Sequence, residues 1–324
     1  MTQAIRVHHY GGPEALQWDE VALGAPGPGE AAIRHSAIGL NFIDIYMRTG
    51  LYPQAEFPFV PGVEGAGVIT ALGEGVSDLE VGDRVAYAGP VGAYSEERLI
   101  AADKLVKIPE GVTAEEAAAA MLKGLTAQML LRQVYKVGPE TVMLYHAAAG
   151  GVGLIACQWA ASLGATVIGT AGGKEKCELA ARHGCTHVID YKNEDFVEAV
   201  QAYTDGKGVD VVYDSVGKDT FPGSLDCLKP RGLWVTFGNA SGPVPEFSAL
   251  LLGQKGSLYA TRPSMFTYAA ERADLLAMAE ELFGVIKDGT VKIDIAQRYG
   301  LKDVGRAHAD LEARQTTGST VLLP

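Results

Sequence analysis

One stretch of the chain restricts the possible folds more than any other part of the sequence. Between Val142 and Gly173, 32 consecutive residues include no Asp, Glu, Lys or Arg. The stretch is long enough to span a membrane, but seven glycines interrupt it, and its apolar residues change from a β run to a helical face and back. A strand–turn–helix–strand unit, buried on both faces of a parallel sheet, explains this pattern better than a membrane span.

Length and charge narrow the class of protein further. At roughly 100–200 residues per domain, the 324 residues predict two domains, and 48% hydrophobic with 20% charged residues indicates a globular chain. The formal net charge of −12 argues against general binding to nucleic acids or anionic membranes. Four cysteines without CxxC spacing, and an N-terminus without a signal-peptide pattern, favour a cytoplasmic location.

Hydrophobic periodicity divides the chain into a β region and an α/β region. Up to about residue 124, short β runs alternate with Gly- and Pro-rich turns, and Thr113 with Glu116 forms a capping box that predicts a helix over 114–122. The next region alternates strands and helices, which indicates a parallel sheet with right-handed crossovers. Its strands are predicted at 141–145, 166–170, 187–190, 209–213, 233–237 and 257–260, and its helices at 151–163, 174–183, 195–204 and 221–228.

The last part of the chain is expected to return to the β region. A helix is predicted over 269–288, and its apolar face carries Leu275, Met278, Leu282 and Ile286. Short β runs follow, and the strand predicted over 320–323 is expected to join the first domain. The expected domains are therefore residues 1–124 together with 266–324, and residues 125–265.

A glycine-rich turn follows the first strand of the α/β region. The segment His146–Gly153 (HAAAGGVG) has the spacing of the dinucleotide fingerprint G-x-G-x-x-G, with Ala148 in place of the first glycine. Gly150 lets the backbone approach a pyrophosphate, and the amides of Gly151 and Val152 point toward it from the start of the helix. A tight turn without a ligand is the alternative, but the flanking strand and helix favour dinucleotide binding.

The end of the second strand distinguishes NADP from NAD. An NAD site needs an acidic residue there to bind the ribose hydroxyls, whereas this chain has AGGKEK over 171–176. Gly172 and Gly173 leave room for a 2′-phosphate, Lys176 supplies a positive charge, and Tyr191 after the third strand is placed to close over it. We therefore expect NADPH; lysines on a solvated helix start are the alternative.

Several motifs together resemble those of a known family. They are IGLNFIDIYMRTGLYP (38–53), PGVEGAGVI (61–69), HAAAGGVGLIACQWA (146–160), YDSVG (213–217), FGNASG (237–242) and GSLYATRP (256–263). The chain is similar over its whole length to the zinc-free quinone oxidoreductases of the zeta-crystallin type, in the medium-chain dehydrogenase/reductase superfamily, and above all to bacterial NADPH:quinone reductases. The resemblance implies a GroES-like β domain around an inserted Rossmann domain, NADPH as cofactor, an active-site cleft and a homodimer.

No metal site is expected. Zinc alcohol dehydrogenases of the same superfamily have a Cys where this chain has Leu40 or Asn41, and a His before the glutamate of a G-H-E triplet that is Gly62-Val63-Glu64 here. A catalytic zinc ion needs three protein ligands, and the seven histidines are scattered along the chain. His146, inside the glycine-rich turn, is interpreted as structural.

The resemblance implies that NADPH reduces quinones in an apolar interdomain cleft without a metal. Negative charge then builds up on the acceptor oxygen, and hydrogen-bond donors or a cation have to stabilise it. Asn41 and Tyr46 are the candidate donors, and Asp44 is expected to orient its neighbours. Tyr52 and Arg262 are candidates for the substrate entrance. An Asn that only caps a turn, and a Tyr46 packed in the core, are the structural alternatives.

Further cofactor contacts follow from the same resemblance. The segment that carries Asn41 and Tyr46 lies at the nicotinamide in the family, and other matching segments border the adenosine side, the nicotinamide end or the returning C-terminal segment. The additional cofactor candidates are Phe42, Ile43, Thr126, Met129, Ser215, Val216, Phe237, Gly238, Asn239, Pro263, Ser264, Met265 and Arg314.

Three questions stay open at the level of sequence. Reduction of activated alkenes, such as enones or alkenals, needs the same apolar slot and polarised carbonyl as quinone reduction. A non-catalytic NADPH-binding protein is another alternative, although the acidic charge and the lack of a basic stripe argue against RNA binding. The strand within 256–263 is expected to pair between the subunits of a dimer; an ordinary edge strand is the alternative.

Overall fold

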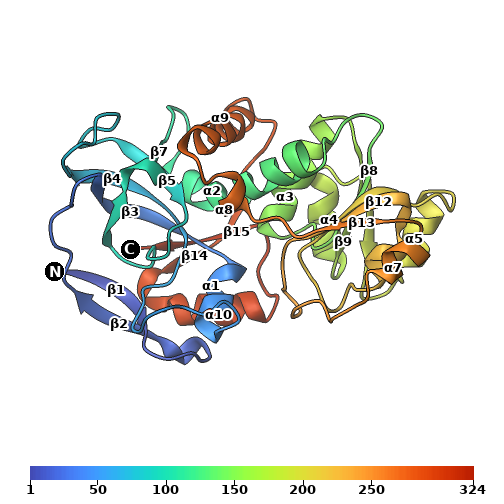
Figure 1. The fold of residues 1–324 in the computed structure, drawn as a ribbon, viewed down its shortest axis with the longest axis horizontal. Coiled ribbons are helices and arrows are strands. Elements are labelled where there is room, and N and C mark those ends of the chain that lie inside the picture. The colour runs from blue at the N-terminus through green and yellow to red at the C-terminus, as the bar shows by residue number, and fades with distance from the viewer. The chain divides into compact units, whose positions relative to one another are not determined.

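The computed structural model describes all 324 residues, and its internal contacts divide the chain into two compact units. Unit 1 consists of Met1–Leu125, Ala269–Lys287 and Ile293–Pro324, and unit 2 of Thr126–Tyr268 and Asp288–Lys292. Both chain ends therefore belong to unit 1 (Figure 1). None of the helices combines the length and the apolar character that crossing a bilayer requires.

A seven-stranded sheet forms the centre of unit 1. Its strands are β3 (Glu30–Leu40), β4 (Glu64–Leu72), β5 (Arg84–Ala88), β6 (Glu97–Ala101), β7 (Val106–Lys107), β14 (Ile295–Gly300) and β15 (Ser319–Leu323). The order is β14-β15-β3-β4-β5-β7, and β6 also pairs with β3. Because β15 pairs with β3, the C-terminus joins the first part of the chain, as predicted. A separate hairpin contains β1 (Thr2–Val7) and β2 (Leu16–Val21).

Apolar side chains from strands far apart in sequence form the core of unit 1. Ile33 and Ile38 of β3, Ile69 of β4 and Tyr87 of β5 are buried in one cluster with Leu322 of β15. Burial of each such side chain contributes about 1.5–3 kcal/mol. This core therefore holds the C-terminal strand against the N-terminal part of the sheet.

Four helices accompany this sheet. They are α1 (Phe42–Thr49), α2 (Ala114–Gln128), α9 (Arg272–Lys287) and α10 (Val304–Glu312), with 3₁₀ turns at Pro13–Ala15, Ala102–Lys104 and Leu301–Asp303. The predicted capping box starts α2: Glu116 N donates to Thr113 Oγ1 at 3.1 Å, and Thr113 N donates to Glu116 Oε2 at 2.9 Å. The helix continues past residue 122 to Gln128, and Gly124 within it lies directly against Leu282 of α9, where a side chain would collide. The prediction that α2 ends at Leu122 was wrong.

A six-stranded parallel sheet forms unit 2. Its strands are β8 (Val142–Tyr145), β9 (Thr166–Ala171), β10 (His187–Asp190), β11 (Val209–Asp214), β12 (Leu228–Thr236) and β13 (Tyr259–Thr261). Their order is β10-β9-β8-β11-β12-β13. The direction in which strands are added reverses between β8 and β11, and such a reversal marks the crevice where α/β sheets bind ligands.

Helices connect the strands of unit 2. They are α3 (Gly151–Ser162), α4 (Lys174–Arg182), α5 (Phe196–Tyr203), α6 (Gly223–Asp226), α7 (Leu250–Gln254) and α8 (Met265–Tyr268), and a π-helical segment, Met129–Val134, continues α2. The uncharged stretch forms β8, α3 and β9, which confirms the predicted strand–turn–helix–strand unit (Figure 1).

Two elements of unit 2 are shorter than predicted. The helix expected over 221–228 is reduced to α6, because Pro222 and Gly223 are poor helix formers and β12 already begins at Leu228. The strand expected over 257–260 begins only at Tyr259, because Ser257 has a φ of 56°, which a strand excludes.

We predict that Thr113→Ala lowers the free energy of unfolding by about 1 kcal/mol, because α2 loses the hydroxyl that accepts from Glu116 N. Urea unfolding followed by circular dichroism measures the change. Thr113→Ser keeps the hydroxyl and is the matched control, so it should retain most of the stability. Equal losses in both variants would contradict the capping role.

Candidate active site

The glycine-rich turn after β8 forms the N-terminal end of α3. Gly150 is the N-cap of α3, and no side chain caps the helix, so the amides of Gly151 and Val152 are available to another partner. Gly153 packs against the turn, because a Cβ there would lie 2.5 Å from Ala147 O. The turn therefore presents backbone amides at the positive end of a helix dipole, as a pyrophosphate site requires.

His146 has the structural role predicted for it. The residue is 1% exposed, and its ring nitrogens lie 3.1 Å from Thr170 Oγ1 and 3.1 Å from Ser224 Oγ. Burial lowers the pKa of His146, so the neutral ring is favoured. With both nitrogens occupied, the side chain connects the glycine-rich turn to β9 and α6.

The segment after β9 brings the predicted 2′-phosphate residues together. A Cβ on Gly172 would lie 2.5 Å from the Tyr191 hydroxyl, so Tyr191 covers a position that only glycine leaves open. Gly173 has a φ of 93° and is the N-cap of α4, whose first turn carries Lys176. Lys192 Nζ lies 4.0 Å from the Cβ position of Gly173, and sequence analysis did not single out this second cation.

Asp190 is a carboxylate near this segment that was not predicted, because the sequence analysis looked for an acidic residue only at the end of β9. It stands at the end of β10 rather than β9, yet its Oδ1 accepts from Gly173 N at 2.8 Å and from Lys192 N at 3.2 Å. Its Oδ2 accepts from Asn193 Nδ2 at 2.7 Å. The hydrogen bond from Gly173 is the main cause of the lowered pKa of Asp190. Asp190 therefore orders the loop around the proposed phosphate position through backbone and side-chain donors.

The ends of β11 and β12 also carry predicted cofactor residues. Ser215 and Val216 follow β11, and Val216 N donates to Asp214 Oδ1 at 2.9 Å. A side chain on Gly238 would collide with the carbonyl of Ser215, so the segments after the two strands lie in direct contact. The segment Phe237–Asn239 is thus placed beside Ser215 at the carboxyl edge of the sheet.

Arg262 has a local role that sequence analysis did not predict. Its NH1 donates to Thr236 Oγ1 at 3.0 Å and to Gly238 O at 3.2 Å. The guanidinium therefore holds the end of β12. Pro263 and Ser264 follow β13 directly, and Met265, which begins α8, is 5% exposed.

Three other cofactor candidates lie outside these segments. Thr126 lies within α2, and Met129, at the start of the π-helical segment, is 1% exposed. Arg314 follows α10 in unit 1 and has a φ of 58°.

Asn41 is held from within unit 1. It is the N-cap of α1 and is 8% exposed. Its Nδ2 donates to Glu64 Oε2 at 2.8 Å and to Gly39 O at 3.3 Å. Both amide hydrogens are thus used inside the protein, so Asn41 does not present the free donor that the sequence predicted.

A buried ion pair lies beside Asn41. Glu64, at the start of β4, is 0% exposed, and Lys123 of α2 is 5% exposed. Lys123 Nζ lies 2.9 Å from Glu64 Oε2, and Leu122 N donates to Glu64 Oε1 at 2.7 Å. With the bond from Asn41, three donors surround the Glu64 carboxylate, which compensates the cost of burying its charge.

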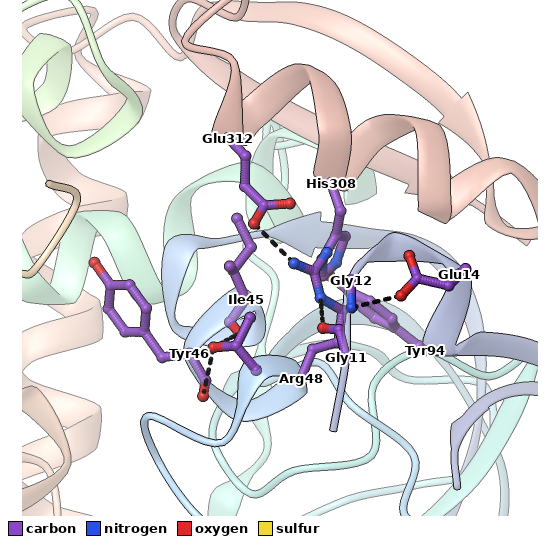
Figure 2. Close-up of polar contacts among 10 residues, drawn as sticks. Gly11, Gly12, Glu14, Ile45, Tyr46, Arg48, Tyr94, His308 and Glu312 are labelled. Carbon is purple, nitrogen blue, oxygen red and sulfur yellow. Dashed lines mark hydrogen bonds and ion pairs between the residues drawn. The ribbon is translucent and has the colours of Figure 1, made fainter. Parts of the chain in front are cut away.

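Asp44 ends a chain of hydrogen bonds within unit 1. The Tyr94 hydroxyl donates to Asp44 Oδ2 at 2.8 Å and lies 3.0 Å from His308 Nε2. Arg48 NH1 is 3.2 Å from His308 Nδ1, and because a guanidinium only donates, Nε2 must carry the ring hydrogen. Arg48 also pairs with Glu312 at 2.8 Å (Figure 2). Every donor from Arg48 onward therefore points toward Asp44.

Burial determines the protonation of His308 and Asp44 in this hydrogen-bond network. It lowers the pKa of His308 to about 3, so the ring is neutral near pH 7. It raises the pKa of Asp44 to about 7, although hydrogen bonds from Tyr94 and Asn41 lower it. Asp44 Oδ2 accepts both of those bonds, whereas Oδ1 is buried without a partner. A proton on Asp44 therefore resides on Oδ1.

The aromatic candidates form a separate group on α1 and in the turn that follows it. The rings of Tyr46 and Tyr52 are 5.3 Å apart at 67°, and Tyr52 N donates to Tyr46 O at 2.9 Å. Phe42 lies 6.3 Å from the Tyr46 ring, and both Phe42 and Ile43 are half-buried. Figure 2 shows the Tyr46 ring leaving α1 on the side away from Arg48.

Sequence analysis missed Lys123, Tyr94 and His308. Tyr94 and His308 carried no signal, because they meet Asp44 and Arg48 across 50 and 260 residues of chain. Lys123 did carry one: it is the only charged residue between Glu116 and Arg132, and a lone charge in an apolar helix indicates a buried partner.

We predict that Asp44→Asn makes the stability of the protein less dependent on pH between about 4 and 7. The folded pKa of about 7 exceeds the ordinary value of 3.8, so Asp44 stabilises the fold fully below pH 4 and loses this contribution as the pH rises to 7. Relative to that of the wild type, the free energy of unfolding of the variant should therefore rise by up to about 1.4 kcal/mol per pH unit in this window. Urea unfolding at several pH values measures the free energy of unfolding of both proteins. If the two free energies change with pH in parallel, the raised pKa of Asp44 is contradicted.

The comparisons with known proteins agree with this geometry. Residues 27–110 match the alcohol dehydrogenase GroES-like domain, and residues 151–281 match the zinc-binding dehydrogenase family. A quinone oxidoreductase of Pseudomonas aeruginosa is 54% identical over 100% of both chains. A 2-haloacrylate reductase of a Burkholderia species is 46% identical over 100% of this chain and 99% of its own.

Among solved structures, the Escherichia coli quinone oxidoreductase complexed with NADPH has a TM-score of 0.98. It is 49% identical and covers 99% of this chain and 100% of its own. The GroES-like match falls in unit 1, and the Rossmann sheet of unit 2 lies largely in the second match. The chain therefore belongs to the quinone oxidoreductase family of the medium-chain dehydrogenase/reductase superfamily.

Proposed function

We propose that the protein is an NADPH-dependent reductase that transfers a hydride to quinones. The observation that carries this proposal is the likeness over the full chain to the quinone oxidoreductase that was solved with NADPH. The open amides of α3 and the glycine segment after β9 support it independently, because they fit a pyrophosphate and a 2′-phosphate.

Residues of unit 2 are proposed to hold the cofactor. The amides of Gly151 and Val152 bind the pyrophosphate, and Tyr191 with Lys176 binds the 2′-phosphate above Gly172. When bound, NADPH supplies the hydride. The remaining cofactor candidates stay part of the proposal: Phe42, Ile43, Tyr46, Thr126, Met129, Gly150, Gly173, Ser215, Val216, Phe237, Gly238, Asn239, Pro263, Ser264, Met265 and Arg314.

The reaction is proposed to need no zinc ion. No group of three or more His, Cys, Asp or Glu side chains is placed to hold a metal. The matched family description mentions zinc, but this chain has Leu40 or Asn41 where the zinc enzymes have Cys, and Val63 where they have His. The acceptor oxygen then has to be stabilised by protein donors. Tyr46, Tyr52 and the groups around Asn41 and Asp44 are the candidates.

A cytoplasmic homodimer is also part of the proposal. β13 is the last strand of its sheet and pairs only with β12. Tyr259, at its start, is 62% exposed. An edge strand with an exposed aromatic residue favours pairing with a second copy of the chain.

Turnover with three acceptors tests the activity. We expect 1,4-benzoquinone to be reduced by NADPH with a higher kcat/KM than a small alkenal or 2-chloroacrylate. The Burkholderia relative favours the alkene as the second candidate substrate. Stopped-flow absorbance of NADPH measures all three. A higher kcat/KM for either alkene would reverse the assignment, and NADPH binding without turnover of any acceptor would indicate a non-catalytic protein.

We predict that Lys176→Ala raises the KM for NADPH at least about tenfold more than the KM for NADH, because only NADPH carries the 2′-phosphate that the lysine binds. Steady-state kinetics with both cofactors measures the two constants. Lys207→Ala removes a lysine whose side chain is 80% exposed beside Asp205 and is the control. Equal changes in the KM values for NADPH and NADH would show that Lys176 does not bind the 2′-phosphate.

A further inference from the structure

The ammonium group of Lys123 is buried with most of its donors unused. Its side chain is 7% exposed, and it donates to Glu64 and to no other group of the protein. An ammonium has three N–H donors, and a buried donor without an acceptor costs about 1–3 kcal/mol. Two hydrogens of Lys123 are thus left for an oxygen that the chain does not supply.

The surroundings of Lys123 show why the chain leaves these donors open. The Glu64 carboxylate is held by Lys123, Asn41 and the Leu122 amide, so the lysine stays in place with its charge balanced. Asp44, which lies close enough for Lys123 to affect its pKa, has an unpartnered Oδ1. Two polar groups of one neighbourhood therefore keep unused hydrogen-bonding capacity, which is the arrangement of a ligand site rather than of a finished core.

Asn41 has no amide hydrogen left to donate to an acceptor oxygen, the role that the sequence predicted for it. Both of its amide hydrogens are bound to Glu64 and Gly39. Of the two groups that donate to Glu64 Oε2, only Lys123 keeps free donors, and it alone carries a positive charge. A cation placed at a developing oxyanion stabilises it more than a neutral donor does.

We infer that Lys123 is a further catalytic residue, which binds the acceptor oxygen through its ammonium group and then protonates it. This inference rests on the proposed quinone reductase function. Glu64 acts as a positioning residue, because it holds the ammonium without touching the acceptor.

The quinone accepts a hydride from the reduced cofactor, which is oxidised, and becomes a hydroquinone monoanion. Lys123 donates a hydrogen bond to the anionic oxygen, and one N–H proton then moves to that oxygen to form the second O–H bond. The neutral amine of Lys123 regains its proton from solvent. Phenols and alkylammonium groups bind protons with similar affinity in water, so the transfer is close to balanced.

Removing Lys123 alone would leave a buried charge on Glu64 and destabilise the fold. The test therefore uses the double variant Lys123→Met with Glu64→Gln, which removes both charges at nearly constant volume. Glu64→Gln alone keeps the lysine but leaves its buried charge without a counter-ion, so this variant is compared only after its folding has been confirmed. The matched control is Lys107→Met with Asp83→Asn, which removes an exposed ion pair of 2.8 Å in unit 1.

Two measurements are made on each folded protein. The first is the single-turnover rate of 1,4-benzoquinone reduction by bound NADPH, with the Kd for NADPH measured separately. We expect the double variant to lose about 100-fold or more in rate, with its Kd for NADPH within twofold of the wild type. Glu64→Gln should lose much less, and the Lys107–Asp83 control should match the wild type.

The second measurement needs no turnover. Absorbance titration of 4-nitrophenol, bound in the presence of NADP⁺, gives the preference of the site for the phenolate. The wild type and the control should favour the phenolate about tenfold or more over the double variant, because only they present the ammonium. The inference is overturned if the double variant reduces quinone as fast as Glu64→Gln, or if its phenolate preference equals that of the wild type. A wild type without quinone turnover overturns the proposed function instead, and the nitrophenol titration still decides the role of Lys123.

Discussion

The buried carboxylate of Glu64 is the constraint on which the arrangement of α1, α2 and β4 in unit 1 depends. An ionised carboxylate costs several kcal/mol to bury unless donors surround it, and Glu64 takes its donors from Asn41, Leu122 and Lys123. These residues lie before α1 and within α2, whereas Glu64 begins β4. One buried charge therefore connects the start of α1 and the later turns of α2 to the first residue of β4.

A second polar chain holds α1 from another side. Arg48, near the end of α1, contacts His308 and Glu312 of α10 (Figure 2). Tyr94 connects His308 to Asp44 in the first turn of α1. The guanidinium cannot accept, so it sets the direction of every bond in the chain. Side chains held by such networks keep one geometry, and a preorganised site needs this to act on a developing charge.

The predictable and unpredictable parts of the site differ in one physical respect. The uncharged stretch predicted β8, α3 and β9, because its glycines, apolar period and cap are local features. Asn41 and Asp44 were candidates from the sequence, but it did not show which distant residues contact them. The Asn41 amide donates to Glu64, 23 residues away, and Asp44 accepts from Tyr94, 50 residues away. Contacts of this kind leave no periodic pattern in the sequence.

The sequence by itself determined the two-domain plan, the parallel sheet, the dinucleotide turn and the absence of a carboxylate at the end of β9, because each depends on neighbouring residues. Only the tertiary structure decided that Asp190 reaches Gly173 from the next strand, that Arg262 holds the end of β12, and that Lys123 lies against Glu64. The reason is burial: a side chain that leaves water needs partners, and folding alone determines which distant residues supply them.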